Sequence, residues 1–200
     1  MSTGLAMKRE ITREDILPMA AYESERRELR RDLVAKKKFR RQDVGPVCTF
    51  YFESYDTMWA QVHEMLYIEK GGEAQIEDEL RAYNPLIPQG RELIATVMFE
   101  IDDERRRKTF LSKLGGVEET AFFEVEGERI LGKPEEDVDR TTAAGKASSV
   151  QFIHFPFTDA QVAKFRQPGT RVVLGFTHPE YSHMTILPEE VRGALAQDFA

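Results

Sequence analysis

Apolar and polar residues repeat along this chain with two different periods, which predict strands in some segments and helices in others. Segments 47–53, 92–101, 150–157 and 171–177 are rich in aromatic and β-branched residues and read as strands. In the first of them, alternation places Cys48, Phe50 and Phe52 on one buried face. Residues 121–125 and 129–131 predict a hairpin that turns at residues 126–128.

Apolar residues spaced three and four apart predict helices between these strands. The strongest pattern follows Ser54, a typical capping residue, and predicts a core face on the helix that carries Trp59. That face comprises Tyr55, Met58, Trp59, Val62, Met65 and Leu66. Shorter helices are expected over 73–83, from 104, from the Thr158–Gln161 capping box, and from 189.

The N-terminal part predicts a different kind of helix, running from Pro18 to about Gln42 without Gly or further Pro. Its apolar positions are sparse, so it has little to bury against the rest of the chain. Together the elements predict an α+β fold, with a mostly antiparallel sheet of about five or six strands, flanking helices and a long charged N-terminal helix. We expect residues 1–44 to form a helical arm of the same domain, 45–200 to form the α+β domain, and 132–148 to be a mobile loop.

Composition narrows the class of protein. The 200 residues carry a net charge of −7 and 41% hydrophobic residues, as in ordinary soluble domains, with no apolar run long enough to span a membrane. The first fifteen residues lack the apolar stretch of a signal peptide, and Cys48 is the only cysteine. A cytoplasmic location is therefore expected.

Charge is unevenly distributed, because residues 26–41 hold nine Lys and Arg against Glu28 and Asp32. This local excess, on an otherwise acidic chain, predicts a surface that docks on a protein partner or on a second copy of the chain. Binding of other anions or of nucleic acid is the less favoured alternative, because base-stacking aromatic residues are scarce there. The residues concerned are Arg26, Arg27, Arg30, Arg31, Lys36, Lys37, Lys38, Arg40 and Arg41.

The segment HPEYSH places His178, Glu180 and His183 within six residues. Imidazole and carboxylate ligands suit transition metals such as Zn, Fe or Mn. A metal site here is one hypothesis, and a polar surface loop is the favoured alternative, because no motif fixes the geometry.

Three further polar residues are candidates for function. Glu53 lies between a buried strand and a helix, where burial can perturb a carboxylate, although a capping role is favoured. His63 is expected at the core boundary beside Trp59, and His154 as a hydrogen-bonded histidine of a strand. Catalytic residues are not identified, so whether the protein is an enzyme stays open. The Gly71-Gly72 and Gly115-Gly116 pairs match neither nucleotide-binding fingerprint.

Several longer motifs resemble an uncharacterised bacterial family, domain-of-unknown-function family 3501. They are ITREDILPMAAYE, GPVCTFYFES with QVHEMLYIEK, ELRAYNPLIPQGRELIATVMFEI, SVQFIHFPFT, and the tail from HPEY to LPEEVRGAL. The resemblance covers nearly the whole chain and implies no chemistry. Genes of this family are often adjacent to those of rubrerythrin-like proteins and an iron–sulfur oxidoreductase, which implies a redox or peroxide-stress context and a partner of that type. Ser54 stands where relatives tend to have Asn, so a role for that amide would be lost.

From these observations we expect a cytoplasmic accessory protein that works by binding a partner. A metal-binding protein or metal-dependent enzyme using residues 178–183 is the first alternative. An anion or nucleic-acid binder using residues 26–41 is the second.

Overall fold

The computed structural model describes residues 8–135, 141–142 and 145–200. Its α-helices there are α1 (Met19–Lys37), α2 (Tyr55–Glu69), α3 (Glu73–Tyr83), α4 (Glu104–Leu111), α5 (Asp159–Arg166) and α6 (Glu189–Leu195). Its strands are β1 (Arg41–Asp43), β2 (Cys48–Phe52), β3 (Glu92–Phe99), β4 (Ala121–Val125), β5 (Glu128–Leu131), β6 (Lys133–Pro134), β7 (Val150–Pro156), β8 (Val172–Phe176) and β9 (Met184–Ile186). Short 3-10 turns include η1 (Arg13–Asp15) and η4 (Ala196–Asp198).

The α+β class and the antiparallel pairing are confirmed, but the strands divide between two sheets. One has the order β1-β2-β3-β7-β6 and the other β5-β4-β8-β9, and every pair is antiparallel. The sequence did not predict β1, β6 or β9, because strands of two or three residues show no alternation to detect. Strand β6 also falls inside the segment 132–148 that was expected to be a loop, and part of that segment lies outside the described residues.

Phenylalanine rings fill the space between the two sheets. Phe50 and Phe155 come from the five-stranded sheet, and Phe123 and Phe176 from the four-stranded sheet. The Phe123 and Phe155 ring centres are 4.8 Å apart with an edge-to-face geometry, and those of Phe50 and Phe176 are 5.2 Å apart. This packing confirms that the predicted face of Cys48, Phe50 and Phe52 is buried.

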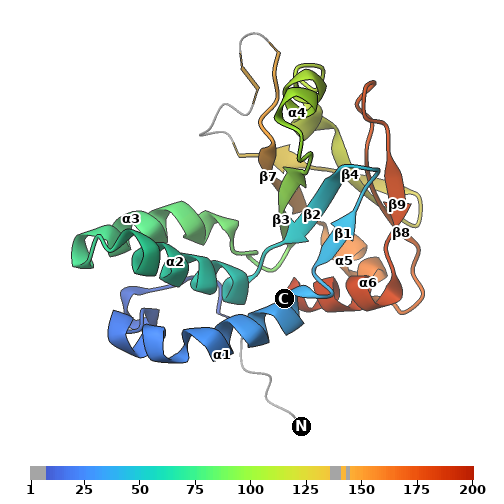
Figure 1. Ribbon diagram of the computed structural model, residues 1–200. Coiled ribbons are helices and arrows are strands. Elements are labelled where there is room, and N and C mark those ends of the chain that lie inside the picture. Colours follow the sequence, from blue (N-terminus) through green and yellow to red (C-terminus); the bar gives the residue numbers. More distant parts are fainter. Residues whose placement is uncertain (1–7, 136–140, 143–144) are drawn as a thin grey trace.

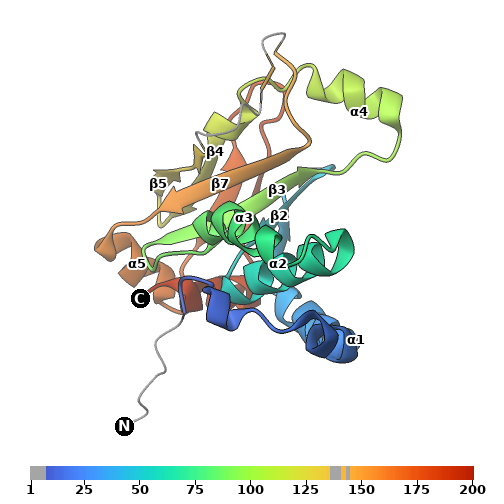
Figure 2. The ribbon, with the colours of Figure 1, turned by 90° about the vertical axis from the view of Figure 1, so that its left-hand side faces the viewer.

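Helices α2 and α3 cover the other face of the five-stranded sheet, and α1 lies against α2 (Figures 1 and 2). Met58, Val62 and Leu66 of α2 form a second core cluster with Ile94 of β3. Trp59 is half-buried and packs against the same cluster, as predicted, and its indole N–H donates to the carbonyl of Asp15 at 2.9 Å. The N-terminal segment therefore contributes to this cluster, through Ile11 and through the partner that it supplies for the polar N–H.

Helix α1 ends at Lys37, not near Gln42, and three of the predicted docking residues, Lys38, Arg40 and Arg41, lie beyond it. Arg41 is in β1. Arg40 is largely buried, and its guanidinium holds Asp198 through contacts of 3.1 and 2.6 Å. It also donates to the carbonyls of Phe52 and Glu53. Arg40 is therefore a structural residue that ties the N-terminal arm to the C-terminal end, which corrects its assignment to an exposed docking surface.

Replacement of Arg40 by Ala should lower the free energy of unfolding by about 3–5 kcal/mol, because it leaves the buried Asp198 without its partner. The Asp198 side chain is only 4% exposed, so water cannot replace the guanidinium. Chemical denaturation measures this loss. Lys38→Ala, at an exposed position two residues away, is the control and should change stability by less than about 0.5 kcal/mol. A loss below about 1 kcal/mol for Arg40→Ala would show that the ion pair between Arg40 and Asp198 is not formed.

Candidate functional site

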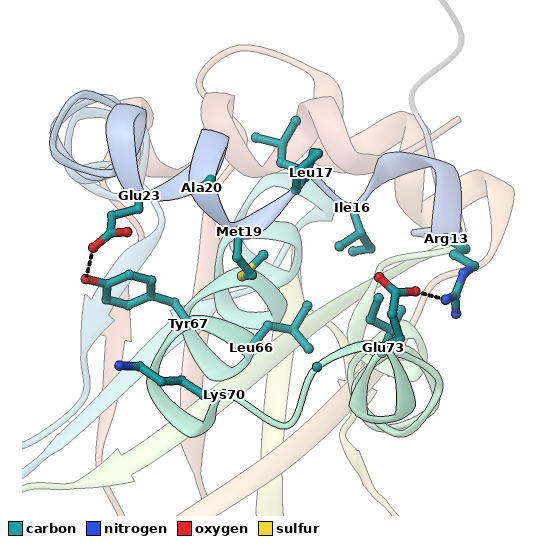
Figure 3. Close-up of a pocket in the computed structure, with 13 residues that line it drawn as sticks. Arg13, Ile16, Leu17, Met19, Ala20, Glu23, Leu66, Tyr67, Lys70 and Glu73 are labelled. Atoms are coloured by element: carbon teal, nitrogen blue, oxygen red, sulfur yellow. Dashed lines mark hydrogen bonds and ion pairs between the residues drawn. The ribbon is translucent and has the colours of Figure 1, made fainter.

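A cavity of about 700 Å³ lies between the N-terminal segment and the turn that joins α2 to α3 (Figure 3). Arg13, residues 16–20 and Glu23 form one wall, and the end of α2 with the start of α3 forms the other. A cavity of this size falls in the range of sites that hold a small molecule or an anchoring side chain of a partner.

The cavity has an apolar floor and a charged rim. Ile16, Met19, Leu66 and Ile76 contribute apolar side chains, of which Leu66 and Ile76 are buried and the other two half-buried. On the rim, Arg13 is paired with Glu73, and the hydroxyl of Tyr67 donates to Glu23 at 3.2 Å. Figure 3 shows these two pairs at opposite ends of the cavity. The arrangement suits a group that is apolar in its centre and polar at its ends.

His63 fixes the wall formed by the N-terminal segment. Its Nδ1 donates to the carbonyl of Trp59 at 2.8 Å, and its Nε2 accepts from the backbone N–H of Leu17 at 3.0 Å. The ring also stacks against Trp59, with centroids 3.9 Å apart. Burial lowers the pKa of His63, which keeps the ring neutral and able to accept that bond. The sequence placed His63 at the core boundary, but it is fully buried and acts as a structural anchor.

A charged network joins α1 to α2 beside the cavity. The Glu64 carboxylate accepts from the hydroxyl of Tyr22 at 2.7 Å and from Arg26 at 2.8 and 2.7 Å. The bonds from Arg26, together with the bond from Tyr22, lower the pKa of Glu64 to about 2, so it stays ionised. The Arg26 guanidinium also lies 4.6 Å from the ring centre of Tyr67. Arg26, one of the predicted docking residues, is thus committed to holding α1 in place.

Lys70 is an unusual residue on the rim. It has φ 56° and ψ 32°, a left-handed conformation that favours glycine, and it ends α2 with its N–H bonded to the carbonyl of Leu66. Among the described residues its ammonium group makes no ion pair. The Gly71-Gly72 pair predicted the end of this helix. Nothing in the sequence indicated that Lys70 and the linker at 16–18 would face each other across a cavity, because they are more than fifty positions apart.

Helix α1 presents a row of exposed side chains that begins at this cavity. Spacings of four and three residues place them on one face of the helix. This row, called the α1 stripe below, consists of Glu23, Arg27, Arg30, Val34 and Lys37. Glu23 also lies on the cavity rim, so the stripe and the cavity are continuous.

The remaining predicted docking residues differ in whether they form ion pairs with acidic residues of the same chain. Within the described residues, Arg27, Arg30, Lys37 and Lys38 make no ion pair. Arg31 contacts Glu28 and Asp32 on the same helix, Lys36 contacts Asp56, and Arg41 contacts Asp43. The exposed cations of α1 without an ion pair in the described part of the chain are therefore Arg27, Arg30 and Lys37, of which Arg30 and Lys37 border the groove between α1 and α2.

The structure does not gather the three residues of the predicted metal site into a ligand set. His178 is 9% exposed; its Nε2 donates to the carbonyl of Gly115 at 3.2 Å and its Nδ1 accepts from the N–H of Glu180. His183 is exposed and lies 4.6 Å from the Tyr181 ring. Across the described part of the chain, no three His, Cys, Asp or Glu residues are gathered so that they could hold a metal ion. The geometry therefore favours the alternative, a polar surface loop, in which Glu180 and His183 are exposed and only His178 is buried.

Glu53 and His154 have partners on the sheet. The buried Glu53 carboxylate accepts from the hydroxyls of Thr57 at 2.5 Å and Thr96 at 2.7 Å, so it joins α2 to β3. The Nδ1 of His154 lies 3.1 Å from Glu92, and its Nε2 lies 4.0 Å from Glu135. Burial alone would lower the pKa of His154, but hydrogen bonds to Glu135 and Glu92 outweigh it and raise the pKa to about 9.

Comparisons with known proteins place the chain among relatives whose function is not known. The model of a family described as "Protein of unknown function (DUF3501)" matches residues 10–199. A crystal structure described as a novel protein of unknown function from Burkholderia pseudomallei is 35% identical, with a TM-score of 0.88. The match covers 95% of this chain and 99% of that one. No curated protein matches the chain. Within the described residues, none of the helices combines the length and the apolar character that a membrane crossing requires.

The raised pKa of His154 predicts a pH-dependent contribution to stability. Protonation of His154 stabilises the folded state, because the folded protein binds this proton more tightly than the unfolded chain does. The contribution of His154 to the free energy of unfolding is therefore complete below pH 6.5 and disappears as the pH rises through about 9. His154→Gln should therefore lower the free energy of unfolding by about 1–2 kcal/mol at pH 6 and have almost no effect near pH 10. Urea denaturation at both values tests this, with His183→Gln as the control at an exposed histidine. An effect of the same size at both pH values would contradict the charged pairing.

Proposed function

We propose that this chain, which belongs to the DUF3501 family of proteins of unknown function, works by binding an acidic, amphipathic segment of a partner protein. The observation that carries the proposal is the form of α1. This helix has 19 residues, yet Tyr22 is its only buried side chain, and it exposes cations without ion-pair partners in the described residues. A helix with so little to bury within its own chain is typical of a surface that serves another molecule.

The α1 stripe and the adjacent cavity together define the kind of partner. Arg27, Arg30 and Lys37 would attract carboxylates, and the apolar floor would accept an aliphatic or aromatic side chain. Because the chain carries −7 overall, the local excess of positive charge at α1 would also orient an acidic partner toward this face. A partner helix with acidic residues along one side and an apolar anchor at one end would match both features.

The family resemblance suggests which proteins to test first. A rubrerythrin-type or iron–sulfur redox protein is the partner class that it implies, and an accessory role in peroxide stress would follow. This assignment of context rests on the resemblance alone, while the chemistry of the docking surface rests on α1 and the cavity.

The triple variant Arg27→Glu, Arg30→Glu and Lys37→Glu should fold normally, because exposed helix charges contribute little to stability, and should lose partner binding. Selection of a random peptide library on the wild-type protein should enrich sequences that combine acidic and apolar residues. Those peptides should bind the triple variant at least about 100-fold more weakly, since several charge contacts are reversed together. Ala20→Trp, which fills the cavity mouth, should weaken the same peptides without reversing any charge.

The matched control is Arg105→Glu with Arg106→Glu on α4, which are also exposed basic helix residues. These changes should leave peptide binding unaltered. Enrichment of peptides without acidic residues, or equal binding to the triple variant, would exclude the proposed role. Binding of duplex DNA or RNA that weakens steeply with salt and is lost in the triple variant would instead support the nucleic-acid alternative.

A further inference from the structure

An apolar row crosses all strands of the four-stranded sheet on its outer face, with exposed side chains on the two edge strands and buried residues between them. The register aligns Leu131 of β5 with Phe122 of β4, then with Gly175 of β8 and Met184 of β9. Ile186 lies on the same face, beside Val173. Leu131, Met184 and Ile186 are 60%, 58% and 59% exposed, and they are three of the six large hydrophobic side chains that are exposed in the described part of the chain. These three side chains therefore share one face of one sheet and are not scattered over the surface.

This face does not belong to the interior of the domain. Phe122 and Val173 are almost fully buried, yet they lie outside both core clusters of the described residues. The Arg129 guanidinium lies 4.2 Å from the ring centre of Phe122 and covers it. Helices α1, α2 and α3 lie on the far side of the other sheet (Figure 1). An exposed methionine and an arginine stacked on an aromatic ring are typical of the centre of a protein interface.

The charges on this face occur in both signs and lie close together. Glu124 of β4 is flanked by Arg129 of β5 and by Arg171, just before β8, with N–O separations of 3.7 and 3.6 Å. These separations are longer than hydrogen bonds, and the Glu124 side chain is 23% exposed. The carboxylate can therefore accept a closer guanidinium from outside the chain.

We propose that this face binds a second copy of the chain, so that the protein forms a two-fold dimer through its four-stranded sheets. In a two-fold contact the same patch meets itself, so its apolar row must meet an apolar row and its charges must be self-complementary. The outer face satisfies both conditions, because Glu124 of each copy can pair with an arginine of the other while the apolar rows pack together. The α1 stripe lies on the other side of the molecule and stays accessible in this dimer.

Sedimentation equilibrium measures the assembly directly, over a range of about 1–100 µM. The wild-type protein should sediment as a dimer in the upper part of this range. Ile186→Glu and Leu131→Glu, which place a charge on the two edge strands, should each raise the dimer dissociation constant by about 100-fold or more. Ile68→Glu is the matched control, because Ile68 is 62% exposed on α2, and it should leave the dimer intact.

A charge exchange provides a second test in case Ile186→Glu or Leu131→Glu folds poorly. Glu124→Arg alone should weaken the dimer, and adding Arg129→Glu with Arg171→Glu should restore it, since the patch then pairs with itself again. Wild-type protein that stays monomeric throughout the range would overturn the proposal. So would a dimer that Ile186→Glu and Leu131→Glu leave unchanged, or one that Ile68→Glu dissociates equally.

Discussion

The polar attachment of α1 to α2 is the constraint on which the rest of this account depends. Helix α1 fully buries only the ring of Tyr22, which packs against Trp59, His63 and Tyr67, so hydrophobic burial alone holds it weakly against the domain. Hydrogen bonds to ionised Glu64 from Tyr22 and Arg26 add to this contact, and His63 fixes the preceding linker through Leu17. These contacts are directional, so they set both the position of the helix and which of its sides faces outward.

That attachment explains how a cavity and a charged stripe come to lie together. The linker at residues 16–18 passes over the end of α2 because His63 binds its backbone, and the gap left beneath it is the cavity. Two cations, the half-buried Arg26 and the largely buried Arg40, form the ion pairs that attach this part of the chain. Arg27, Arg30 and Lys37 remain exposed to solvent. The proposed partner surface and the proposed dimer face are then separated by both sheets. Binding at one would not obstruct the other.

Local patterns in the sequence predicted much of the fold, because they act over a few residues. Alternation in residues 48–52, the capping box at Thr158 and the hairpin between β4 and β5 are all present as predicted. Contacts between distant segments were not predictable in this way. Arg40 looked like one more surface cation until Asp198, 158 positions away, was found beside it. Trp59 packs on the core face that its spacing predicted, but no local pattern indicated that its N–H would find a partner in Asp15, 44 positions away. The cavity similarly depends on two segments whose closeness no local pattern encodes.

Hydrogen exchange of the α1 backbone amides tests the central claim, that α1 is a fixed platform held by its polar contacts with α2. In the wild-type protein, amides of residues 22–37 should be protected well beyond what an isolated helix of this length provides. Glu64→Gln should speed exchange in α1 by about 10-fold or more and leave β2, β3 and β7 unchanged, because it removes the ionised acceptor and not the core. Unprotected α1 amides in the wild-type protein, or the same exchange in α1 with and without Glu64, would contradict the account.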